Sequence, residues 1–106
     1  MKRVSYAEDH FLTDDRVADA LMGYARTLGI AGKADVVKVP GVDDDGMLRT
    51  YELLIGPASQ ISSHGTDDAS VEMDVEAAIR SLRGQEEDQL PSLQLPPDED
   101  VEEAER

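Results

Sequence analysis

Apolar side chains recur at helical spacing in two stretches of the chain. The first stretch carries them every three or four residues, at Val17, Leu21, Tyr24 and Leu28. Thr13 precedes this stretch and is the expected N-cap, because a threonine hydroxyl can accept a hydrogen bond from a first-turn amide. The helix is expected to end at Gly29 or Gly32. Gly23 in its interior indicates that another backbone packs closely there.

The second stretch is residues 71–84, where one helical face carries Val71, Val75, Ala78, Ile79 and Leu82. Val71, Met73 and Val75 also alternate as they would in a strand, so residues 71–75 fit either a helix or a strand. We favour a helix, because the helical period continues to Leu82. Gly84 is expected to end it.

Alternation of apolar and polar residues predicts the strands. The Asp-Asp-Asp-Gly sequence at residues 43–46 favours a tight turn and predicts a β-hairpin between the runs on either side. The Gly-Pro pair at residues 56–57 is expected to end the second strand of that hairpin. The predicted strands are residues 2–8, residues 36–39, residues 50–55 and a weak edge strand around Ile61.

These elements follow the order β-α-β-β-(β)-α. Each has one apolar side, so we expect an α+β fold, a small two-layer domain. Its sheet would be mostly antiparallel, with three to four strands, and both helices would lie on one face. The predicted core consists of Val17, Leu21, Tyr24, Leu28, Val37, Val39, Tyr51, Leu53, Ile55, Ile79 and Leu82.

The C-terminal part, residues 85–106, differs in composition from the rest. It holds three of the five prolines and nine of the twenty-four acidic residues, with Arg106 as its only base. Such a segment buries too little apolar surface to offset the entropy lost on ordering. We therefore predict a compact α+β domain at residues 1–84 and a disordered acidic tail at residues 85–106.

Composition also narrows the classes of function. The chain has 106 residues, a formal net charge of −14 and no cysteine. Its negative charge repels phosphate backbones and anionic lipids, so direct binding to nucleic acid or membrane is not expected. Two bases stand near the N-terminus without an apolar stretch behind them, so we do not expect a signal peptide. No apolar run reaches the roughly 20 residues that a membrane span requires, so the cytoplasm is the expected location.

No motif indicates catalysis or metal binding. Residues 43–46 fit part of a calcium loop, but Gly41 stands where the first ligand belongs, and strands flank the segment in place of helices. His10 and His64 lack a second histidine at the spacing of a zinc site. We expect no catalytic residue, no metal ligand and no cofactor, and enzyme activity is disfavoured.

Two segments are candidates for interaction. The bend at residues 56–60 has small and polar side chains at a strand end, where binding loops often lie, and His10 is expected near it. Three leucines of the predicted tail could lie extended in a partner's groove. The candidate residues are Gly56, Pro57, Ser59, Gln60 and His10 at the bend, and Leu90, Leu93 and Leu95 in the tail.

Three functions fit these features. The first is a small, non-catalytic protein-interaction module that binds a protein partner or forms a homo-oligomer. The second is a small-molecule-binding domain, or a minor enzyme subunit, with a pocket at residues 56–60. The third is an acidic mimic of nucleic acid, which ranks last because mimicry requires carboxylates on an ordered surface.

Overall fold

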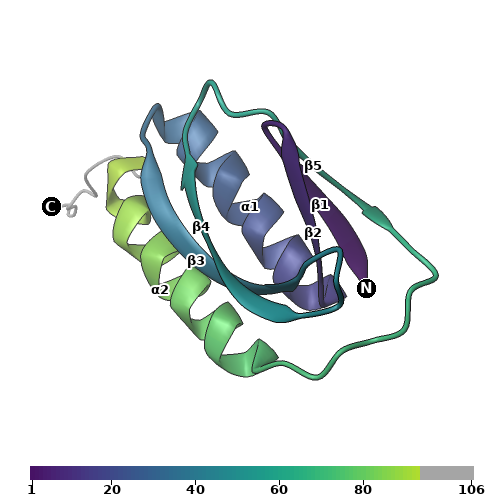
Figure 1. Ribbon diagram of the computed structural model, residues 1–106. Coiled ribbons are helices and arrows are strands. Elements are labelled where there is room, and N and C mark those ends of the chain that lie inside the picture. The colour runs from purple at the N-terminus through teal and green to yellow at the C-terminus, as the bar shows by residue number, and fades with distance from the viewer. Residues whose placement is uncertain (94–106) are drawn as a thin grey trace, which may run out of the picture.

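The computed structural model describes residues 1–93 and places side chains through residue 89. Its α+β class is as predicted, but the sheet has five antiparallel strands instead of three or four, in the order β4-β3-β2-β1-β5. Both helices cover one face of this sheet (Figure 1). In chain order the elements are β1 (Lys2–Tyr6), β2 (Asp9–Thr13), α1 (Asp15–Ala31), β3 (Asp35–Val42), β4 (Leu48–Ile55), β5 (Ile61–Gly65) and α2 (Val75–Leu93).

The extra strand is β2, which pairs with β1 where a single strand over residues 2–8 was expected. The turn between them contains Ala7, whose φ of 56° lies in the left-handed region. A turn of this kind normally carries glycine or asparagine, so the sequence gives no sign of it. The predicted strand is therefore wrong in length, and a hairpin takes its place.

The start of α1 also differs from the expectation. Asp14 is the N-cap, and its carboxylate accepts a hydrogen bond from the amide of Arg16 at 2.8 Å. Thr13 instead belongs to β2 and is fully buried, and its hydroxyl donates to the carbonyl of Pro40 at 2.8 Å. Gly32 ends the helix with a φ of 67°, as expected for a C-cap glycine. Apart from its chain neighbours and the helix's own backbone, no atom lies within 4 Å of a Cβ added at Gly23, so the predicted close packing of another backbone there is wrong.

The second helix starts later and ends later than predicted. It begins at Val75, because the carboxylate of Asp74 accepts a hydrogen bond from the amide of Ala77 at 3.1 Å and so caps the first turn. Residues 71–74 are neither helix nor strand. The helix does not end at Gly84 but continues to Leu93, so residues 85–93 of the predicted tail are helical. The remainder of that tail, residues 94–106, lies outside the described residues.

The core lies between the helices and the sheet. Of the eleven residues predicted for it, nine are buried, while Tyr51 and Ile79 are partly exposed. Val4 and Phe11 of the N-terminal hairpin add to it. The rings of Phe11 and Tyr51 stack with centroids 4.3 Å apart, and both contact Gly41. In the part of the chain that is described, neither helix has the length and apolarity needed to cross a membrane.

The sheet consists of two parts that meet at one point. Strands β3 and β4 pair along their whole length, and β1 pairs along its length with both β2 and β5. Between β2 and β3, in contrast, the only paired residues are Leu12 and Val42. The two parts therefore separate away from that point, and the connection from β4 to β5 crosses between them at the opposite end (Figure 1).

Candidate functional site

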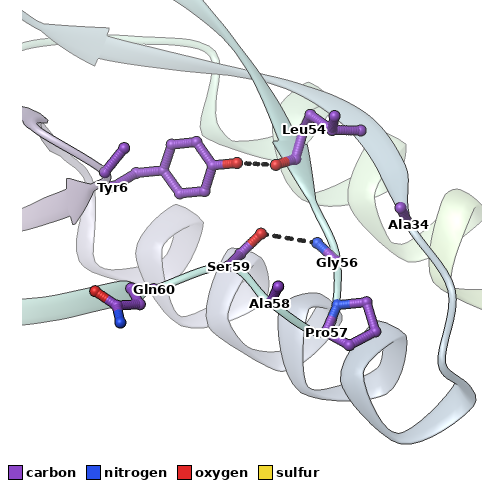
Figure 2. A pocket seen from close by; sticks show the side chains of 9 residues that line it. Tyr6, Ala34, Leu54, Gly56, Pro57, Ala58, Ser59 and Gln60 are labelled. Atoms are coloured by element: carbon purple, nitrogen blue, oxygen red, sulfur yellow. Dashed lines mark hydrogen bonds between the residues drawn. The ribbon is translucent and has the colours of Figure 1, made fainter.

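A hollow of about 560 Å³ lies where the two parts of the sheet separate. The bend at residues 56–60 forms one wall, and the other walls come from Tyr6, Ala7, Ala34 and Leu54 (Figure 2). These residues come from three segments that are distant in the sequence. The predicted binding loop therefore does line a concave surface.

The bend is held in shape by its own hydrogen bonds. The amide of Ser59 donates to the carbonyl of Gly56 at 3.0 Å, and the amide of Gly56 donates to the hydroxyl of Ser59 at 2.9 Å. Pro57 occupies the second position of this turn, where its fixed φ is favourable. A Cβ on Gly56 would lie 3.0 Å from the Cβ of Ala34, so the small residue allows the bend to pack against the start of β3. These hydrogen bonds and this contact with Ala34 hold the wall of the hollow in place.

The N-terminal hairpin supplies the opposite wall. The hydroxyl of Tyr6 donates a hydrogen bond to the carbonyl of Leu54, so its ring spans the distance between β1 and β4 (Figure 2). The amide of Ala7 donates to the carbonyl of Gln60 at 3.5 Å, which ties the strained turn to the bend. Unfavourable backbone geometry persists only where the surrounding structure holds it in place, and it is found more often near functional sites.

The hollow can bind an apolar group, and the phenol of Tyr6 is the one titratable side chain among its lining residues. No carboxylate, imidazole, amine or guanidinium is among its lining residues. The hydroxyls of Tyr6 and Ser59 are both engaged in hydrogen bonds within the protein. The remaining surface is made of alanine, glycine, proline and leucine, with only the amide of Gln60 as a further polar side chain.

The structure places His10 away from the hollow. Its Nε2 lies 3.0 Å from the Oδ1 of Asp44, in the turn between β3 and β4. The expectation that His10 lies near the bend is therefore wrong. The reason is that β2 runs back from the Ala7 turn toward the meeting point of Leu12 and Val42.

The acidic turn at residues 43–46 is organised internally. One oxygen of the Asp43 carboxylate accepts from the amides of Asp45 and Met47, both at 2.9 Å, and the other accepts from the guanidinium of Arg49. Above all the hydrogen bond from Arg49, and then these amides, lower the pKa of Asp43 below its usual value. Within residues 1–93, no three His, Asp or Glu side chains group closely enough to hold a metal ion.

The leucines proposed as a docking segment lie at the end of the described chain or beyond it. Leu90 and Leu93 lie on the last turns of α2, and Leu95 lies outside the described residues. The backbone at Leu90 and Leu93 is helical in this structure, whereas the predicted docking segment was extended. Their contact with a partner stays a prediction.

The hollow also depends on four residues that the sequence analysis did not identify as site residues. Tyr6 ends β1 and Ala7 follows it, Ala34 precedes β3, and Leu54 lies in β4. Only the tertiary fold brings these three segments together. The positive φ of Ala7 has no local sequence signal, and Tyr6 looks like an ordinary inward-facing strand residue. Comparisons with protein-family models, curated proteins and solved structures find no match to this chain.

Proposed function

We propose that this protein is a non-catalytic protein-interaction module whose hollow at residues 56–60 receives an apolar side chain of a partner protein. The observation that carries this proposal is the chemistry of the lining: most side chains are apolar and small, and the nearby hydroxyls are hydrogen-bonded within the protein. Such a surface favours burial of an apolar side chain, and burying a leucine or phenylalanine contributes about 1.5–3 kcal/mol. The expected setting is the cytoplasm.

A small-molecule site is the second candidate. The volume of about 560 Å³ favours it, because this is within the range of pockets that hold small ligands. Ligand pockets, however, usually have a few polar groups that fix the orientation of the ligand. Here the Tyr6 hydroxyl already donates to Leu54 and the Ser59 hydroxyl already accepts from Gly56, and most of the remaining lining is apolar. An apolar protein side chain therefore fits this surface better than a polar metabolite.

The experiment is to fill the hollow and measure what the protein captures. Ala58→Trp places an indole in the hollow, and Ala69→Trp places the same group in the exposed loop before α2. Proteins captured from native lysate by the unaltered chain and by Ala69→Trp, but lost with Ala58→Trp, would support the proposal. Equal capture of partner proteins by all three chains would contradict it. It would also be contradicted if Ala58→Trp still captured the same proteins and lost only a bound small molecule, detected by mass spectrometry.

A further inference from the structure

The hydrogen-bonding pattern of the β3–β4 hairpin determines which backbone groups of β4 point away from it. Residues facing each other in an antiparallel pair alternate between hydrogen-bonded and non-hydrogen-bonded positions. At the turn, the amide of Asp43 donates to the carbonyl of Met47 at 3.0 Å, so these two form a hydrogen-bonded pair. In the observed register, Pro40 and Thr50 then form a non-hydrogen-bonded pair.

Two side chains that bond to β3 confirm this alternation. Pro40 has no N–H, and its carbonyl accepts from the hydroxyl of Thr13 at 2.8 Å, away from β4. At Val36, which faces Leu54, the carbonyl accepts from the side-chain amide of Gln85 at 2.8 Å. The backbone groups of β3 at these positions therefore point away from β4.

By the same alternation, the N–H and C=O groups of Thr50, Glu52 and Leu54 point outward from β4, which is an edge strand of the sheet. Among the described residues, only the carbonyl of Leu54 has a partner there, the hydroxyl of Tyr6. All three residues are exposed. Their outward groups repeat every two residues, or roughly 6.8 Å, which is the repeat of an extended chain.

We propose that the outer edge of β4, from Thr50 to Leu54, binds an extended peptide as an added strand. The peptide would insert one apolar side chain into the hollow. This rests on the function proposed above for the hollow, and it adds the mode of binding and the class of partner. Leu54 connects the two features, because it ends the free backbone ladder and also lines the hollow. In binding of this kind, backbone hydrogen bonds supply affinity and a side-chain pocket supplies specificity.

Charge indicates the chemistry of the peptide. The chain carries a formal net charge of −14, and the β3–β4 hairpin, residues 35–55, holds five acidic residues against the two bases Lys38 and Arg49. An acidic segment would be repelled, and a second copy of this chain would add another fourteen negative charges. The partner is therefore an extended segment that alternates apolar and basic residues. The affinity for such a basic peptide should fall as salt is added, because salt screens the attraction between opposite charges. Self-association of this acidic chain through the same edge should instead become stronger as salt is added.

The test uses a synthetic nine-residue peptide of alternating valine and lysine with a central leucine, titrated into the isotopically labelled full chain. Amide signals of Thr50, Glu52 and Leu54 are expected to shift together. Thr50→Pro removes one outward N–H without touching the β3–β4 ladder, and Thr50→Ala keeps that N–H. The proline variant is expected to weaken binding about tenfold relative to the alanine variant, the effect of losing one hydrogen bond.

A second measurement leaves the protein unaltered. Two versions of the peptide carry N-methyl groups on alternate residues. In one version the methyl groups lie on the edge that would face β4, and in the other they lie on the opposite edge. Only the version methylated on the edge facing β4 is expected to lose binding. Binding that maps to the hollow but is equal for both peptides and both Thr50 variants would overturn strand addition and leave the proposed function standing. No binding at roughly 1 mM peptide, or dimerisation of the chain alone through β4, would also overturn it.

Discussion

The hydroxyl of Tyr24 in α1 donates a hydrogen bond to the carboxylate of Asp35 at the first position of β3. Tyr24 is otherwise fully buried in the core, so this bond satisfies its one polar atom. The side-chain amide of Gln85 in α2 donates to the same carboxylate oxygen at 3.0 Å. Asp35 therefore connects both helices to the sheet at the end where α1 leads into β3.

Tyr24→Phe is expected to lower the free energy of unfolding by about 1–2 kcal/mol at neutral pH, because a hydrogen bond to a charged acceptor is lost while the ring is kept. The hydrogen bond from Tyr24 is the main reason that the pKa of Asp35 is lowered. A lowered folded-state pKa stabilises the fold above the unfolded value, and this stability is lost as pH falls through the folded pKa. Urea unfolding at several pH values should thus show the gap between the two proteins narrowing below roughly pH 4. A gap that is constant down to acid pH would contradict this role for Asp35.

The contacts of α2 change the expectation for truncation. From composition alone, removal of everything after Gly84 leaves the fold intact. In the structure, Gln85 bonds to Asp35, and the hydroxyl of Thr27 donates to the carboxylate of Glu86 at 2.6 Å. A chain ending at Gly84 loses both contacts and the last turns of the helix. We expect its melting temperature to fall by about 5–10 °C, given that 1 kcal/mol corresponds to roughly 4–8 °C in a domain of this size.

The matched control for this truncation is a chain that ends after Leu93, which keeps the whole described part of α2. Its melting temperature should equal that of the full chain within about 2 °C. Gln85→Ala in the full chain should reproduce part of the loss. Equal melting of both truncated chains would show that the helix beyond Gly84 contributes no stability.

Two glycines should respond to the same substitution with opposite sign. A Cβ on Gly41 would lie 2.5 Å from the Cδ2 of Phe11 and 3.0 Å from the ring of Tyr51, two rings that are already stacked. Gly41→Ala should therefore destabilise the fold by about 1–3 kcal/mol through overpacking. Gly23→Ala meets nothing within 4 Å in the interior of α1 and should stabilise by about 0.5–1 kcal/mol. Denaturant unfolding of both variants measures the two signs, and a destabilised Gly23→Ala would mean that α1 packs differently.

The sequence predicted those elements in which apolar residues recur at a regular spacing over a short stretch of the chain. Helix α1 and the β3–β4 hairpin each carry a periodic apolar pattern, and most of the predicted core comes from them. Strand β2 was missed because the turn at Ala7 lacks glycine or asparagine. The end of α2 was missed because glycine frequently ends helices, which makes Gly84 its expected end. The hydrogen bonds of Gln85 and Glu86 beyond that point join the helix to residues distant in the sequence, and no local pattern predicts them.

The candidate site was predicted only on one side. The bend at residues 56–60 has a local composition typical of binding loops, and it lines the hollow. Tyr6 and Ala7 complete the hollow because the two parts of the sheet meet only at Leu12 and Val42 and then separate. That separation depends on long-range pairing, which no pattern along the chain encodes.

The turn at Ala7 gives the last prediction, because it tests whether the N-terminal wall of the hollow is strained. Alanine at a φ of 56° is unfavourable by about 1–2 kcal/mol, while glycine adopts this conformation freely. Ala7→Gly should therefore leave the free energy of unfolding unchanged or raise it by up to about 1 kcal/mol, since relief of strain offsets the added entropy of the unfolded chain. Ala7→Val should lower the free energy of unfolding by at least about 1 kcal/mol, because a β-branched residue tolerates positive φ poorly. Glu8→Val is the matched control: it adds the same side chain at the neighbouring turn residue, which has no positive φ, and should change stability much less. Equal losses for the two valine variants would show that the positive φ at Ala7 carries no strain.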